Sequence, residues 1–86
     1  MNFIKEENRI YSKNEKEEII AEITFSEIEK GIFNINHTFV DESLRGKGIA
    51  KKLVEMAIEE IKRKNGKVVA TCSYAKKYIE KNNKGI

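Results

Sequence analysis

Apolar and polar residues alternate along two segments in the first half of the chain, and this period of two predicts strands. In residues 19–25, one face carries Ile19, Ala21, Ile23 and Phe25. In residues 32–40, the alternation predicts a shared face formed by Phe33, Ile35, His37 and Phe39. Residues 9–12 predict a shorter strand before a polar turn at 13–16.

The pattern changes to that of a helix after Gly48. Apolar residues now recur at helical spacing, so one helical face carries Ala50, Leu53, Val54, Ala57, Ile58 and Ile61. Asn65 and Gly66 can adopt positive φ and predict the end of this helix. Residues 67–71 predict a further strand, and residues 74–81 predict a short helix with Ser73 as a candidate N-cap.

These elements predict an α+β fold in the order β-β-β-α-β-α. Three successive strands favour an antiparallel meander, whereas the helix after the third strand favours a parallel, right-handed connection to the fourth. The sheet should therefore be mixed and mostly antiparallel, with the long helix packed on it. A chain of 86 residues without proline or a low-complexity linker is expected to form one domain, residues 1–86.

Composition narrows the class of protein. No apolar run exceeds three residues, whereas a membrane helix needs about 20. The first residues lack the apolar core of a signal peptide, so we expect a cytoplasmic protein without a membrane segment. One Cys and one His cannot form an internal disulfide or supply four zinc ligands by themselves, and we expect no metal site.

Charge divides the chain into two halves. Residues 1–43 carry 5 Lys or Arg against 10 Asp or Glu, which gives −5, and residues 44–86 carry 12 against 4, which gives +8. A basic half suggests an anionic partner such as a phosphorylated cofactor or a nucleic acid, and the alternative is a solvated helix surface. A nucleic-acid partner is disfavoured because the aromatic residues are scattered and tryptophan is absent.

A glycine-containing loop, Leu44-Arg45-Gly46-Lys47-Gly48-Ile49-Ala50, precedes the long predicted helix. Its two glycines allow tight turns, and the free N–H groups of a helix start favour an anion such as a pyrophosphate. The alternative is a connection that serves only strand-to-helix geometry. The Walker pattern is absent, and Lys51 occupies the third glycine position of the dinucleotide fingerprint.

The run from Arg45 to Ala50 resembles the R/Q-x-x-G-x-G/A signature with which the GNAT superfamily of acetyltransferases holds the pyrophosphate of acetyl-CoA. His37-Thr38-Phe39-Val40 and Cys72-Ser73-Tyr74 resemble the signatures of a subgroup of short, single-domain GNAT-like N-acetyltransferases. The resemblance covers residues 9–82. It implies that acetyl-CoA lies between two splayed parallel strands, residues 32–40 and 67–71.

In that arrangement, backbone groups of Phe39 and Val40 would hold the pantetheine arm and polarise the thioester. The resemblance assigns the phosphates to a loop made of Arg45, Gly46, Lys47, Gly48, Ile49, Ala50 and Lys51. It also implies a small acetyltransferase that passes the acetyl group to an unidentified amine. The alternative function is a CoA-binding module with little catalysis, because the short chain leaves the acceptor site open. We expect a monomer.

Three side chains are candidates for catalysis. Cys72 precedes a predicted helix, whose dipole lowers a thiol pKa, and it is either an acetyl-accepting nucleophile or a residue that lines the acyl pocket. His37 is either a general base or a packed core residue. Tyr74 shares a helical face with Tyr78, and it either protonates the departing CoA thiolate or packs against the sheet.

Overall fold

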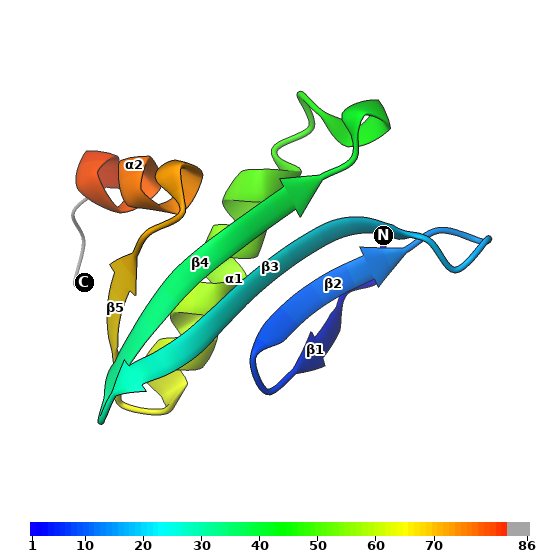
Figure 1. Cartoon of the computed structure of the whole chain (residues 1–86). Helices are drawn as coiled ribbons and strands as arrows, with labels where there is room; N and C mark the ends of the chain where they lie inside the picture. Colours follow the sequence, from blue (N-terminus) through cyan, green and yellow to red (C-terminus); the bar gives the residue numbers. More distant parts are fainter. Residues whose placement is uncertain (83–86) are drawn as a thin grey trace.

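The computed structural model describes residues 1–82, so the last residues of the predicted domain 1–86 lie outside the described part. Five strands form one mixed sheet: β1 (Ile4–Glu6), β2 (Arg9–Lys13), β3 (Ile19–Glu29), β4 (Ile32–Val40) and β5 (Lys67–Ala70). Three helices complete it: the 3-10 helix η1 (Glu42–Leu44), α1 (Ile49–Arg63) and α2 (Ser73–Asn82). α1 lies across one face of the sheet, and α2 lies near β5 (Figure 1).

The predicted order of elements is confirmed, with β1 and η1 as additions that the sequence patterns did not indicate. β1 to β4 pair antiparallel and β5 pairs parallel to β4, as the intervening helix predicted. Several boundaries differ from the prediction, most by one residue, and two of the differences have a structural reason. β3 continues through a polar stretch to Glu29 because β4 pairs with it there. α2 begins at Ser73, and the Cys72 carbonyl accepts a hydrogen bond from the Lys76 N–H at 2.9 Å, so Cys72 rather than Ser73 occupies the N-cap position.

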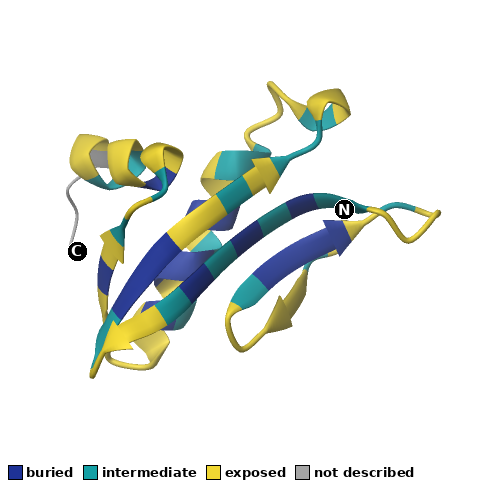
Figure 2. Cartoon of the chain, in the orientation of Figure 1, coloured by how far each residue is buried: buried dark blue, intermediate teal, exposed yellow. Residues whose placement is uncertain are grey.

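The core lies between the sheet and α1 (Figure 2). The helical stripe predicted from the sequence is buried except at Ala50, which is half-buried. The exposed fractions are 0% for Leu53, Val54, Ala57 and Ile61 and 8% for Ile58. The stripe packs with Ala21, Ile23 and Phe25 of β3, which share one face as predicted. Each such large apolar side chain contributes about 1.5–3 kcal/mol by burial. Among residues 1–82, neither α-helix combines the length and apolarity needed to cross a bilayer.

A bulge in β4 corrects the predicted face of this strand. Thr24 lies opposite His37, but Phe25 lies opposite Ile35, so Asn36 is an extra residue on β4. An extra residue reverses which side chains face the core. Ile35 is therefore buried, whereas His37 is exposed on the opposite face, where Phe39 also lies. The predicted face shared by Phe33, Ile35, His37 and Phe39 was wrong, and so was the core alternative for His37.

α1 ends just before Asn65 and Gly66, as predicted, and these two residues have different roles. Asn65 adopts the positive φ, at 60°, and the Gly66 N–H donates to the Ile61 carbonyl at 2.9 Å. A Cβ on Gly66 would lie 2.6 Å from a ring carbon of Phe33. Gly66 is thus required because a side chain here would collide with Phe33, and not because of its φ. β5 starts at the next residue, Lys67.

Candidate functional site

The loop between β4 and α1 takes its shape from one cap and two left-handed glycines. Asp41 accepts a hydrogen bond from the Ser43 N–H at 3.0 Å and another from the Ser43 hydroxyl, which starts η1. These bonds, with a smaller contribution from the Arg45 charge, hold the pKa of Asp41 below its usual value. Gly46 and Gly48 have φ values of 82° and 72°. A Cβ at either glycine would meet nothing within 4 Å, so their backbone conformation is what favours glycine.

This loop presents a row of free backbone donors. The N–H groups from Gly46 to Lys51 have no acceptor within residues 1–82. The last three belong to the first turn of α1, where the helix dipole adds positive potential. Arg45, Lys47 and Lys51 are exposed around the loop, and they form no ion pair with the described part of the chain. The arrangement suits a multiply charged anion such as a diphosphate.

A groove of about 340 Å³ continues from this loop between α1 and α2. Its lining combines aromatic rings with cationic side chains: Lys51, Tyr74, Lys77, Tyr78 and Lys81. The Tyr78 hydroxyl donates to Glu55 Oε2 at 3.0 Å. Burial, followed by this carboxylate, raises the pKa of Tyr78, so the ring stays neutral. The size and lining of the groove suit a flat, phosphorylated group next to the loop of residues 45–51.

β4 and β5 separate beyond their fourth pair. The parallel register ends with Ile35 opposite Ala70, and the N–H groups of Thr71 and Cys72 both donate to the Ile35 carbonyl, at 3.1 and 3.2 Å. β4 continues to Val40 beside β3 alone. Residues 36–40 of β4 therefore have no strand partner on the side of β5, and we call the space along this unpaired edge the gap.

The hydrogen-bond pattern determines which backbone groups face this gap. The Asp41 N–H donates to the Ile20 carbonyl of β3 at 2.8 Å. Antiparallel pairs alternate between bonded and non-bonded positions, so the main-chain groups of Phe39 also face β3. Those of Thr38 and Val40 face the gap. Of the two residues predicted to hold the cofactor, Val40 has its backbone directed there, while Phe39 exposes its ring, at 38%, on the open face of the sheet.

Cys72 lies half-buried beside the gap, at the start of α2. Its Sγ is 3.4 Å from the Thr38 hydroxyl oxygen. Burial raises the pKa of this thiol, but hydrogen bonds from the Thr38 side chain and from the N–H groups of Ala75 and Tyr74 outweigh it. The net result is a pKa below the ordinary thiol value, which increases the thiolate fraction. Thr38 was not among the residues selected from the sequence, because only the β4 bulge turns it toward Cys72.

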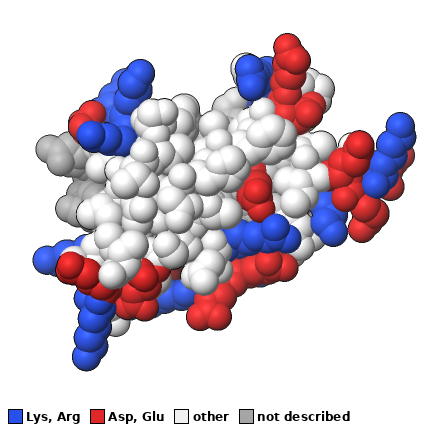
Figure 3. Space-filling view, in the orientation of Figure 1, with Lys and Arg blue, Asp and Glu red and all other residues white. Residues whose placement is uncertain are grey.

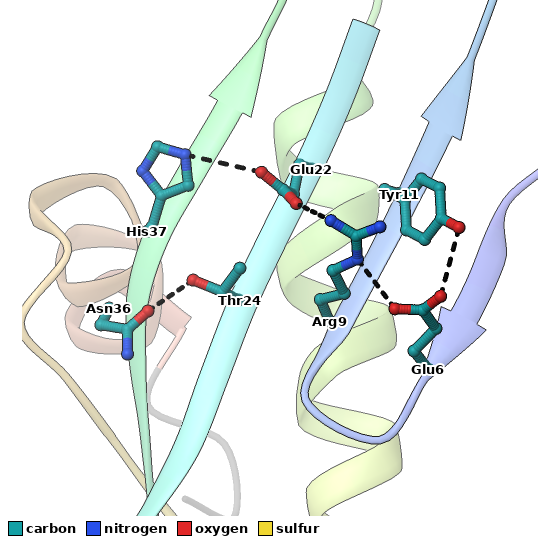
Figure 4. Close-up of polar contacts among 7 residues, drawn as sticks. All are labelled: Glu6, Arg9, Tyr11, Glu22, Thr24, Asn36 and His37. Carbon is teal, nitrogen blue, oxygen red and sulfur yellow. Dashed lines mark hydrogen bonds and ion pairs between the residues drawn. The ribbon is translucent and has the colours of Figure 1, made fainter. Parts of the chain in front are cut away.

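The other two catalytic candidates occupy separate positions. His37 projects from the open face of the sheet, 54% exposed, with its Nε2 4.0 Å from Glu22 Oε1 (Figure 4). Tyr74 is 41% exposed on α2 and lines the groove. No hydrogen bond between side chains within residues 1–82 joins Cys72, His37 and Tyr74 to one another, and the Tyr74 contact with the thiol is made by its backbone N–H. Glu22 was also missed, because an outward Glu on a strand carries no signal in the sequence pattern.

Comparison with known proteins identifies the family. Residues 9–85 match the GCN5-related N-acetyl-transferase family. The proteins named NATD1 from Gallus gallus, Mus musculus and Homo sapiens are 34% identical over 62 residues, 72% of this chain. The match covers 55–56% of their length, so the chain spans little more than half of these relatives.

Solved structures agree with this result. A GCN5-like protein from Staphylococcus aureus, determined by NMR, superimposes with a TM-score of 0.79 and 34% identity, over 95% of this chain and 80% of that one. The Escherichia coli GNAT family N-acetyltransferase YhbS, solved in complex with CoA, shares the fold, with a TM-score of 0.62 and 20% identity over 72% of this chain and 38% of that one. The glycine loop, the splayed strands and these matches show that the chain belongs to the family of GCN5-related N-acetyltransferases.

Proposed function

We propose that this protein binds acetyl-CoA and transfers its acetyl group to an amine. The observation that carries the proposal is the row of free N–H groups from Gly46 to Lys51, which lies beside a gap between two parallel strands. When bound, acetyl-CoA supplies an acetyl group activated as a thioester. The row of amides fits its diphosphate, and Arg45, Lys47 and Lys51 add mobile positive charge.

The splayed segment of β4 suits the pantetheine arm. Phe39 and Val40 form the strand that would hold it, and the Val40 main chain faces the gap. Acyl transfer develops negative charge on the thioester oxygen, and one fixed N–H donor lowers such a barrier by about 3–4 kcal/mol. The Val40 N–H is the candidate donor, since it requires no reorganisation during the reaction.

Cys72 offers a covalent route. Its thiolate would attack the thioester carbonyl and expel CoA as a thiolate, and the amine would then attack the acetyl-cysteine and release the Cys72 thiolate. The lowered pKa and the position beside the gap favour this role. Direct attack by the amine is the other route, in which Cys72 only lines the acyl pocket.

Two further residues would move protons. His37 is half-exposed and free to exchange with solvent, so it suits a general base that takes a proton from the acceptor ammonium. Tyr74 lies on the helix that starts at the thiol, and it is the candidate that protonates the departing CoA thiolate.

The acceptor site is open, which favours one alternative function. Within residues 1–82, no helix covers the face of the sheet that carries His37 (Figure 1). A CoA-binding module with little catalysis would share the diphosphate loop without forming an acceptor pocket.

A thermal shift and a mass measurement test the proposal together. Acetyl-CoA at millimolar concentration should raise Tm, because a ligand that binds only the folded state stabilises it. Intact mass after incubation should show one added acetyl group on the wild type and none on Cys72→Ala if the route is covalent. An unchanged Tm contradicts both CoA functions. A raised Tm with no turnover of any amine favours the binding module.

A further inference from the structure

A line of charged side chains crosses the open face of the sheet from β1 to β4 (Figure 4). Glu6 accepts hydrogen bonds from Arg9 Nε at 2.9 Å and from the Tyr11 hydroxyl at 3.2 Å. Arg9 Nη1 donates to Glu22 Oε2 at 2.9 Å, and its guanidinium stacks 3.9 Å from the centre of the Tyr11 ring. The second oxygen of Glu22 points toward His37 Nε2, 4.0 Å away.

This line has one negative charge in excess while His37 is neutral, because two carboxylates share a single guanidinium. Both oxygens of Glu6 have donors, but Glu22 Oε1 has none within hydrogen-bond distance among residues 1–82. The Glu22 side chain is only 17% exposed, so its charge is less screened by water than an exposed carboxylate. Glu22 Oε1 can therefore accept a hydrogen bond from a further cation.

Glu22 lies on β3, one strand away from the gap, and His37 of β4 is its neighbour on that side. Glu22 pairs with Phe39, one residue before Val40, whose main chain faces the gap. α1 packs on the other face of the sheet, and β4 has no strand neighbour on the β5 side beyond Ile35. A molecule bound on the open face would approach a group held on the helix side along this unpaired edge. Charged side chains lie mainly around the rim of this face (Figure 3).

A hollow of about 550 Å³ adjoins the charged line on the same face. Glu6 and Arg9 belong to both, and the other lining groups are mostly carboxylates, amides and hydroxyls, among them Glu7, Asn8, Thr24 and Asn36. Such groups accept hydrogen bonds from ammonium groups, and the volume suits a small molecule. The hollow fits the remainder of an amine with more than one positive charge.

We propose that Glu22 binds the reacting ammonium of a small polycationic amine, a polyamine, and thereby selects the acceptor. This inference rests on the proposed acetyl transfer. The ammonium donates to Glu22 Oε1 and gives its proton to His37 Nε2, which leaves a lone pair on the amine nitrogen for attack on the acetyl carbon. The half-exposed imidazolium then loses the proton to solvent.

Binding can be tested without the cofactor. Spermidine should shift the backbone amide signals of Glu22 and His37 in the NMR spectrum of the wild type. The affinity should fall by about tenfold or more in Glu22→Gln, which removes one charged hydrogen bond. Glu29→Gln, the same change at the exposed end of β3, should retain wild-type affinity. Aniline, a neutral amine, should bind equally to all three proteins.

Kinetics separate this role from a structural one. In Glu22→Gln the KM for spermidine should rise by about tenfold or more while the KM for acetyl-CoA is unchanged, and Glu22→Asp should recover part of the loss. His37→Gln, on an exposed side chain, should lower kcat. Equal spermidine affinity in wild type and Glu22→Gln overturns the inference, as does no spermidine binding to the wild type. Loss of acetyl-CoA binding in the wild type would instead reject the proposed function.

Discussion

The Cys72 thiol has an environment set by a few individual groups. The Thr38 hydroxyl lies 3.4 Å from Sγ, and two N–H groups of the first turn of α2 also lower the thiol pKa. Burial acts in the opposite direction and is outweighed. The lowered pKa of this thiol therefore depends in part on a contact between β4 and the start of α2 that a single methyl-for-hydroxyl exchange removes.

Thr38→Val should raise the pKa of Cys72, because it removes the hydrogen bond while keeping the shape of the side chain. Iodoacetamide reacts with the thiolate, so alkylation at neutral pH should slow, and the midpoint of its pH profile should move to higher pH. Thr38→Ser keeps the hydroxyl and should leave the profile close to that of the wild type. An identical profile in Thr38→Val would show that the hydroxyl does not act on the thiol.

Single-residue roles were the hardest to predict from the sequence. Alternation placed His37 in the core, but one extra residue in β4, Asn36, turns it outward and turns Thr38 toward Cys72. Asn36 carries no distinct sequence signal of a bulge. The partners Glu22 and Thr38 were missed for the same reason, since both depend on strand register.

Helices and strands were more predictable than the roles of single residues, because their sequence patterns are local. The helical stripe of α1, the stop at Asn65 and Gly66, and the parallel pairing of β5 all follow from spacing and connection rules. The turn-forming conformation of the loop before α1 was also predictable, since Gly46 and Gly48 do adopt the left-handed conformation that glycine favours. β1 was not predicted because three residues are too few to show a period.

Gly48→Ala tests the loop as an element. A side chain at positive φ costs about 1–2 kcal/mol, so the free energy of unfolding should fall by about that amount in urea denaturation. Acetyl-CoA affinity should also fall as the amides turn away from their present directions. Lys47→Ala lies in the same loop and removes a charge without this strain. It should keep the stability of the wild type, and an equal stability loss in both variants would contradict this account of the loop.

At the scale of the whole molecule, a thin core supports one sheet, and the proposed site uses both of its faces. A chain of this length has a free energy of unfolding of roughly 4–13 kcal/mol. The acidic first half contributes the open face with Glu22, and the basic second half contributes the loop and groove. We infer that cofactor and acceptor approach from opposite faces and meet where β4 and β5 separate.

Leu53→Ala tests how much the thin core can lose. Leu53 is fully buried in α1, and such truncations cost about 2–5 kcal/mol. Thermal and urea unfolding should both show this loss, which is a large fraction of the total free energy of unfolding. Lys62→Ala, on the exposed side of the same helix, should change stability by less than about 0.5 kcal/mol. A loss below 1 kcal/mol in Leu53→Ala would mean that the helix does not form the centre of the core.

The most direct measurement is a titration of the isotope-labelled protein with CoA, followed through its backbone amide signals. The largest shifts should fall on residues 46–51, with smaller shifts at Thr38, Val40 and Cys72 around the gap. Inorganic pyrophosphate should reproduce the loop shifts alone. If CoA binds but leaves the amides of residues 46–51 unmoved, the loop does not hold the diphosphate and the account of the site is wrong.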